Sequence, residues 1–229
     1  MQHIVIVGDS WGEPNWRGPI RPGFSERGHT ATRLAEKGMT VYNYSDSGRG
    51  NLNTWIRLKM RPPPMAHAVI WFHTEIARDL DPMEPRDSLQ NVLDRTANLV
   101  YDRCCQIQQR FLANVPLIVV EGQSQRHQPH FDQYFKDYEL IKDWRAALLN
   151  QQSLPYTPLL VMLSQGTDIL DKFNNKISEK SQWLKDAEIV MDMMKNSEQF
   201  PDNCHPGDEA HAELTERLCR MIDARAAKR

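Results

Sequence analysis

Three side chains from opposite ends of the chain have the chemical types that acyl transfer requires. Ser10 follows an apolar run at residues 4–7, and Asp202 and His205 lie three residues apart near the carboxyl terminus. A serine hydroxyl becomes a nucleophile when an imidazole accepts its proton, and a carboxylate can orient that imidazole and stabilise its charged form. Residues of these types predict hydrolysis through an acyl-serine intermediate.

The predicted elements around these residues support this interpretation. Residues 3–7 read as a buried strand, which places Ser10 at its carboxyl end, where open α/β sheets carry their reactive groups. Pro206 indicates the first turn of a terminal helix, and the positive end of a helix dipole favours the neutral imidazole that a base needs. Gly-Asp-Ser alone is also typical of a turn, and Asp-x-x-His alone is typical of a helix cap, so the prediction depends on their combination.

Four short segments resemble the sequence blocks of the SGNH (GDSL-type) hydrolase family. Residues 8–10 (Gly-Asp-Ser) look like the first block, residues 47–51 (Ser-Gly-Arg-Gly-Asn) like the second, and residues 202–205 (Asp-x-x-His) like the last. The third block departs from the family pattern. The family usually has Gly-x-Asn-Asp there, and this chain has Phe-His-Thr-Glu at residues 72–75.

The resemblance implies a role for each matched residue. Ser10 would be the nucleophile, His205 the general base and acid, and Asp202 the orienting carboxylate. The backbone N–H groups of Ser10 and Gly48 would form the oxyanion hole. Thr74 stands where the family has its oxyanion asparagine, and its hydroxyl could donate one hydrogen bond as a third donor.

The order of elements predicts an α/β fold. Apolar runs alternate with helical patterns, which indicates βαβ units and a parallel sheet. The predicted strands are 3–7, 39–44, 66–72, 115–120 and 159–163, and the predicted helices are 25–37, 51–60, 87–113, 134–150, 178–197 and 207–228. Ser25 and Asn51 are predicted helix N-caps. The resemblance implies a three-layer sandwich with about five parallel strands in flavodoxin-like order.

We expect a single domain over residues 1–229. Residues 123–200 are longer than a minimal sheet needs, and we expect a loop at 123–133 and a helical cover beside the site within this stretch. Net charge is −2, which predicts no attraction to nucleic acid or to a membrane. The four cysteines show no disulfide or metal spacing, and the amino terminus has no signal-peptide pattern, so a cytoplasmic location is expected. Release by lysis or export on an assembly would fit equally.

The substrate class is predicted only broadly. The resemblance spans lipases, thioesterases and carbohydrate O-deacetylases, and no cofactor is implied. The chain has no long apolar segment of the kind that covers a lipid site. Trp11 and Trp16 would suit stacking on a sugar ring, and Arg49 would suit an anionic substrate, so a small-molecule or glycan ester is favoured, with a carbohydrate O-deacetylase as one form. The alternatives are that Trp11 and Trp16 pack their loop against the core and that Arg49 is a solvated surface charge. The sequence does not predict the oligomeric state.

Three other classes of function were weighed. The first is an SGNH-like domain that has become a binding or structural module, which the altered third block suggests. The second is a metal site, suggested by two groups of side chains: His127, His130 and Asp132, and Asp202, His205, Asp208 and His211. No His-x-x-x-His or Cys-x-x-Cys pair accompanies them. The third is a nucleotide-binding domain, which lacks a glycine-rich phosphate motif here.

Overall fold

The computed structural model describes residues 1–13, 28–74, 76–79, 89–121, 128–141 and 205–227. The strands are β1 (His3–Gly8), β2 (Thr40–Asn43), β3 (Ala68–His73), β4 (Leu117–Glu121) and β5 (Tyr138–Ile141). The helices are α1 (Thr30–Glu36), α2 (Asn51–Met60), the short 3-10 helix η1 (Ile76–Asp79), α3 (Leu89–Phe111), α4 (Gln128–Tyr134) and α9 (Asp208–Ala226).

The five strands form one parallel sheet in the order β2-β1-β3-β4-β5. This is the flavodoxin-like order, so the predicted fold class is confirmed. β1 and β3 occupy the middle of the sheet, and Gly8 at the end of β1 pairs with Phe72 near the end of β3. Parallel strands covered on both faces read as continuous apolar runs, which explains why β1, β3 and β4 could be recognised in the sequence.

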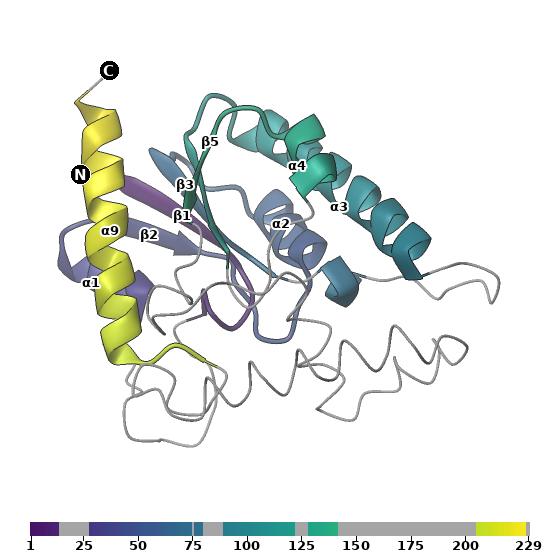
Figure 1. Ribbon diagram of the computed structural model, residues 1–229. Coiled ribbons are helices and arrows are strands. Elements are labelled where there is room, and N and C mark those ends of the chain that lie inside the picture. Colours follow the sequence, from purple (N-terminus) through teal and green to yellow (C-terminus); the bar gives the residue numbers. More distant parts are fainter. Residues whose placement is uncertain (14–27, 75, 80–88, 122–127, 142–204, 228–229) are drawn as a thin grey trace.

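Helices cover both faces of the sheet and give three layers (Figure 1). Alternate residues of β1 point to opposite faces: Val5 and Val7 pack in one core cluster, Ile4 and Ile6 in the other. The first cluster contains side chains of α2, α3 and α4, and the second contains side chains of α1 and α9. Each face therefore has its own hydrophobic core, and the carboxyl ends of β1 and β3 lie between them.

The apolar stripe of α9 packs on the sheet as predicted. Its buried apolar residues recur every four positions, which keeps them on one face of the helix: Ala210, Leu214, Leu218 and Ile222. Full burial of a leucine side chain contributes about 1.5–3 kcal/mol. The stripe therefore holds α9, and with it the segment that contains His205, against the sheet.

The predictions were wrong on the carboxyl side of β4. Residues 128–134 form α4 where a loop was expected, and residues 138–141 form β5 inside the expected helix 134–150. The segment is too short to show a clear period, and Tyr138 and Leu140 face one core while Ile141 faces the other, as in a strand. The strand predicted at 159–163 and the helix at 178–197 lie outside the described residues.

Two predicted helix caps were also wrong. Helix α1 begins at Thr30, and His29 is its N-cap, accepting a hydrogen bond from the Ala31 N–H. Helix α2 has Gly50 at the N-cap, and Asn51 is its first residue. The side chain of Asn51 is used elsewhere, because it lies between α2 and the end of β3.

Candidate active site

Ser10 and His205 lie in hydrogen-bond contact although 195 residues separate them in the sequence. The Oγ of Ser10 is 3.0 Å from Nε2 of His205, which is within the range of a nucleophile and its base. Ser10 is buried directly after β1, and His205 is half-buried in the bend before α9. The parallel sheet brings them together, because it places the end of β1 next to the start of the helix that covers it.

The turn that carries Ser10 is shaped by glycine. Gly8 has φ of +152°, and a Cβ there would lie 2.5 Å from Cβ of Phe72 on the neighbouring strand. Only glycine fits this approach. The Gly12 N–H donates to the Asp9 carbonyl at 3.0 Å, and the Trp11 N–H donates to Oδ1 of Asp9 at 3.0 Å. These bonds close the chain around Ser10 in a compact turn.

The segment 45–50 docks against the same turn. The Asp46 N–H donates to the Gly8 carbonyl at 3.0 Å, and the side chain of Asn43 donates to the Gly12 carbonyl at 2.6 Å. Gly48 is exposed with φ of +72°. Within the described part of the chain, no acceptor is hydrogen-bonded to the N–H of Ser10 or of Gly48.

Thr74 lies beside the turn that carries Ser10 and is bonded to it. Its hydroxyl donates to Oδ2 of Asp9 at 2.8 Å, and both side chains are buried. The guanidinium of Arg78 lies 3.9 Å from the same carboxylate oxygen. The expected role of Thr74 as an oxyanion donor stays a prediction, but its hydroxyl is directed at Asp9 in this arrangement.

Asn51 and Asp79 fix the backbone of Thr74 and the start of α2, and neither role was predicted from the sequence. The side chain of Asn51 accepts from the Thr74 N–H at 3.1 Å and donates to the Thr74 carbonyl at 2.8 Å. Asp79 accepts from the first two N–H groups of α2, those of Asn51 at 2.8 Å and Leu52 at 3.1 Å. Burial raises the pKa of Asp79 to about 6, and these hydrogen bonds lower it in part. A Cβ on Gly50 would lie 2.2 Å from Asp79, so glycine is needed there.

A pair of buried imidazoles lies between α1 and α9. The rings of His29 and His211 are 4.1 Å apart, centroid to centroid. His29 donates from Nε2 to the Trp11 carbonyl at 3.2 Å and accepts at Nδ1 from the Ala31 N–H at 3.2 Å, and His211 contacts the Thr30 hydroxyl at 2.9 Å. Burial lowers the pKa of His29 to about 4 and that of His211 well below its usual value. Both rings are therefore neutral at pH 7, and the sequence offered no signal for the pair.

The remaining predicted site residues lie as follows. Trp11 is 2% exposed and packs in the core, which fits the alternative that its indole packs the loop. Arg49 is exposed beside Gly48, and its guanidinium pairs with Asp46 at 3.2 Å. Trp16 and Asp202 lie outside the described residues. The described chain thus brings together Ser10 and His205, with Gly48 and Thr74 in the segments that are bonded to the turn that carries Ser10.

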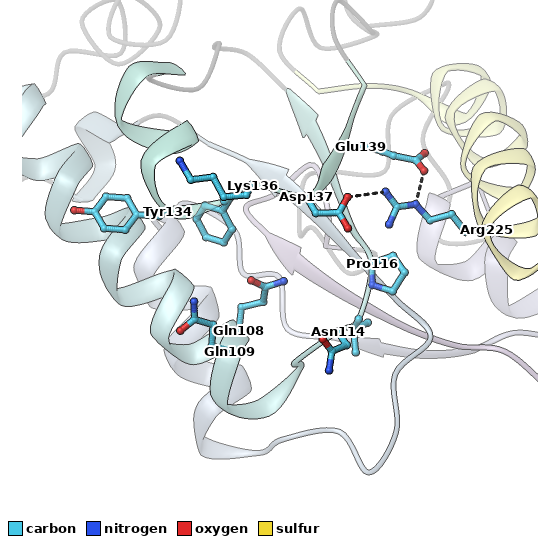
Figure 2. A pocket seen from close by; sticks show the side chains of 11 residues that line it. Gln108, Gln109, Asn114, Pro116, Tyr134, Lys136, Asp137, Glu139 and Arg225 are labelled. Carbon is cyan, nitrogen blue, oxygen red and sulfur yellow. Dashed lines mark hydrogen bonds and ion pairs between the residues drawn. The ribbon is translucent and has the colours of Figure 1, made fainter. Parts of the chain in front are cut away.

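A hollow lies at the amino ends of β4 and β5 (Figure 2). Its volume is about 600 Å³, and its lining includes Pro116 just before β4 and Asp137 just before β5. Arg225 of α9 pairs there with Glu139 and, at 3.8 Å, with Asp137. This polar hollow lies at the amino ends of the strands and contains neither Ser10 nor His205.

No three His, Cys, Asp or Glu side chains among the residues with assigned positions converge to hold a metal ion. None of the helices described above has the length and apolar character that a membrane crossing requires.

Comparison with solved structures finds chains of similar fold. The esterase EstA from a Pseudoalteromonas species, in a structure described as inhibited by monoethylphosphonate, aligns over 99% of this chain and 100% of its own, with 12% identity and a TM-score of 0.50. A lipase/acylhydrolase from Enterococcus faecalis aligns over 98% of this chain and 97% of its own, with 14% identity and a TM-score of 0.46. No protein-family model matches the sequence, and a search of curated proteins finds no match. At 12% identity the likeness to EstA establishes the fold alone.

Proposed function

We propose that the protein hydrolyses carboxylic esters through an acyl intermediate on Ser10. The observation that carries this proposal is the 3.0 Å contact between Oγ of Ser10 and Nε2 of His205 at the carboxyl edge of the sheet. A hydroxyl and an imidazole at this distance can exchange a proton directly. The shared fold with EstA, which is described as an esterase, is consistent with the proposal.

The reaction would proceed in two halves. In the first, Oγ of Ser10 bonds to the carbonyl carbon of the ester while its proton passes to Nε2 of His205. The carbonyl oxygen becomes an oxyanion, which the N–H groups of Ser10 and Gly48 would bind. The bond to the alcohol oxygen then breaks, and His205 donates the proton to the departing alcohol.

The second half restores the enzyme. A water molecule gives its proton to His205 and bonds to the acyl carbon, and collapse of that intermediate returns the proton to Oγ of Ser10 and releases the acid. In this proposal Asp202 orients His205 through its other ring nitrogen. No metal or cofactor takes part in either half.

We propose a short acyl group, such as an acetyl ester on a small molecule or a glycan, as the substrate. The support is indirect: Ser10 is itself only 8% exposed, which disfavours a bulky acyl chain, and Arg49 is exposed beside Gly48, where its charge would suit an anionic substrate. The buried indole of Trp11 gives no support to sugar stacking. The length of the acyl group is therefore tested before the identity of the alcohol portion.

The test is hydrolysis of p-nitrophenyl acetate, butyrate and octanoate by the wild type, Ser10→Ala and His205→Ala. We expect each variant to lose at least about 10³-fold in kcat while its thermal unfolding stays that of a folded protein. His67→Ala is the matched histidine control, since His67 lies at the amino edge of the sheet beside His3. A p-nitrophenyl phosphonate should add to Ser10, located by peptide mass. Equal rates for the wild type and Ser10→Ala would refute the proposal.

That refuting outcome would favour the second candidate, a binding or structural module with this fold. The observation that keeps it open is the third segment of the site, where Thr74 replaces the asparagine of the family pattern and has its hydroxyl bonded to Asp9. A site with fewer oxyanion donors would be a weaker catalyst. A phosphonate that fails to label the folded wild type would point the same way.

A further inference from the structure

The hydroxyl proton of Thr74 already has an acceptor. Its Oγ donates to Oδ2 of Asp9 at 2.8 Å, and the two side chains are 4% and 6% exposed. A hydroxyl has a single proton to donate, and a carboxylate can only accept. Thr74 therefore has no second proton for an oxyanion that forms beside Ser10.

Asp9 links Thr74 to the turn that carries Ser10. Its Oδ1 accepts from the Trp11 N–H, and its backbone carbonyl accepts from the Gly12 N–H, both at 3.0 Å. These contacts set the backbone on both sides of Ser10. An oxyanion donor must lie about 2.7–3.1 Å from the oxygen it stabilises, so the orientation of the Ser10 N–H depends on this turn.

Thr74 and Arg78 hold Asp9 from the side of β3. The backbone N–H and carbonyl of Thr74 are both bonded to the side chain of Asn51, at 3.1 and 2.8 Å. The guanidinium of Arg78 lies 3.9 Å from Oδ2 of Asp9, and its side chain is 17% exposed. Because Thr74 is fixed by its backbone, its hydroxyl is a rigid anchor for the carboxylate.

We infer, on the basis of the function proposed above, that Thr74 is a positioning residue. Its hydroxyl holds Asp9, and Asp9 holds the turn that aims the N–H of Ser10. The oxyanion hole then consists of two backbone N–H groups, those of Ser10 and Gly48. This assignment replaces the direct donation that the sequence pattern predicts for Thr74.

A double-mutant cycle separates the two roles. Thr74→Val removes the hydroxyl at nearly constant volume, Asp9→Ala removes the acceptor, and Thr74→Ser keeps the hydroxyl as the matched control. We expect Thr74→Val to lower kcat about tenfold with little change in KM, Thr74→Ser to keep the wild-type kcat, and Thr74→Val to cost nothing further in Asp9→Ala. A loss of the same size in both backgrounds, or no loss in either, overturns the inference.

A second measurement does not depend on catalysis or on the folding of Asp9→Ala. Hydrogen exchange at the Trp11 N–H reports its bond to Asp9. This amide should exchange about fivefold to tenfold faster in Thr74→Val than in Thr74→Ser, because a hydrogen bond of about 1 kcal/mol is weakened. Unchanged exchange overturns the inference. If the proposed function fails, the wild type and Ser10→Ala hydrolyse esters equally, and the exchange result still decides the role of Thr74.

Discussion

Acid should destabilise the protein through the buried His29–His211 pair. His29 satisfies both ring nitrogens in one neutral tautomer, donating from Nε2 to the Trp11 carbonyl and accepting at Nδ1 from the Ala31 N–H. A proton on Nδ1 would break the cap of α1 and place a charge 4.1 Å from the ring of His211. The perturbation is therefore a fall in pH from 7 to 5.

The pKa of His29 gives the magnitude and the sign. Burial lowers this pKa from 6.5 to about 4, so the unfolded chain takes up a proton at higher pH than the folded protein does. The stability from neutral His29 is complete above pH 6.5 and is lost as the pH falls toward 4. The loss is about 2 kcal/mol by pH 5 and about 3 kcal/mol by pH 4. His211, whose pKa is also lowered by burial, His29, Arg33 and His205, adds to the loss.

The assay is denaturant unfolding at pH 7, 6 and 5 for the wild type and His29→Asn. Asparagine keeps an oxygen that can cap α1 but does not titrate, so this variant is the matched control. We expect the free energy of unfolding to fall between pH 7 and 5 by about 2 kcal/mol more in the wild type than in His29→Asn. Titrating groups that do not contact His29 cancel in the comparison, whereas the part of the lowered His211 pKa that comes from His29 is lost in His29→Asn and belongs to the measured difference.

Equal pH dependence in the two proteins would refute this reasoning. It would mean that His29 takes up its proton at the same pH in the folded and unfolded chains, and that the ring is not isolated from water as its 7% exposure indicates. A lower stability of His29→Asn at pH 7 alone would not decide the question, because this variant also loses the bond to Trp11.

Two further predictions concern residues that shape the site. Gly8→Ala should lower the free energy of unfolding by about 3 kcal/mol, because the new Cβ would lie 2.5 Å from Cβ of Phe72. Gly38→Ala is the control: Gly38 has φ of +85° and no atom within 4 Å of the new Cβ, so this change should lower the free energy of unfolding by only about 1 kcal/mol. Equal losses in denaturant unfolding would contradict this. Burial raises the pKa of Asp79 to about 6, so the folded protein takes up this proton at a higher pH than the unfolded chain does. Lowering the pH from 7 to 5 should therefore raise the free energy of unfolding of the wild type by about 1 kcal/mol relative to that of Asp79→Asn. The same unfolding series checks it, and a difference that does not change with pH would count against it.

The sequence alone determined the central sheet and the two ends of the candidate site. Residues 4–7 and 68–72 are apolar at every position, a pattern typical of a strand buried on both faces, and the structure has β1 and β3 there. The four-residue spacing from Ala210 to Ile222 predicted the buried face of α9. Ser10 and His205 were identified because their neighbours, a glycine after a strand and a proline before a helix, are local signals.

Tertiary structure decided which partner each polar group took. Thr74 and Asp9 are 65 residues apart, and Thr30 and His211 are 181 apart, so no local pattern relates them. The spacing that made Thr74 a candidate donor says nothing of where its single proton goes; that depends on how β1 and β3 place Asp9 beside it. The short strand β5 was missed for a related reason, because four residues acquire a strand's character only from the β4 edge that they pair with.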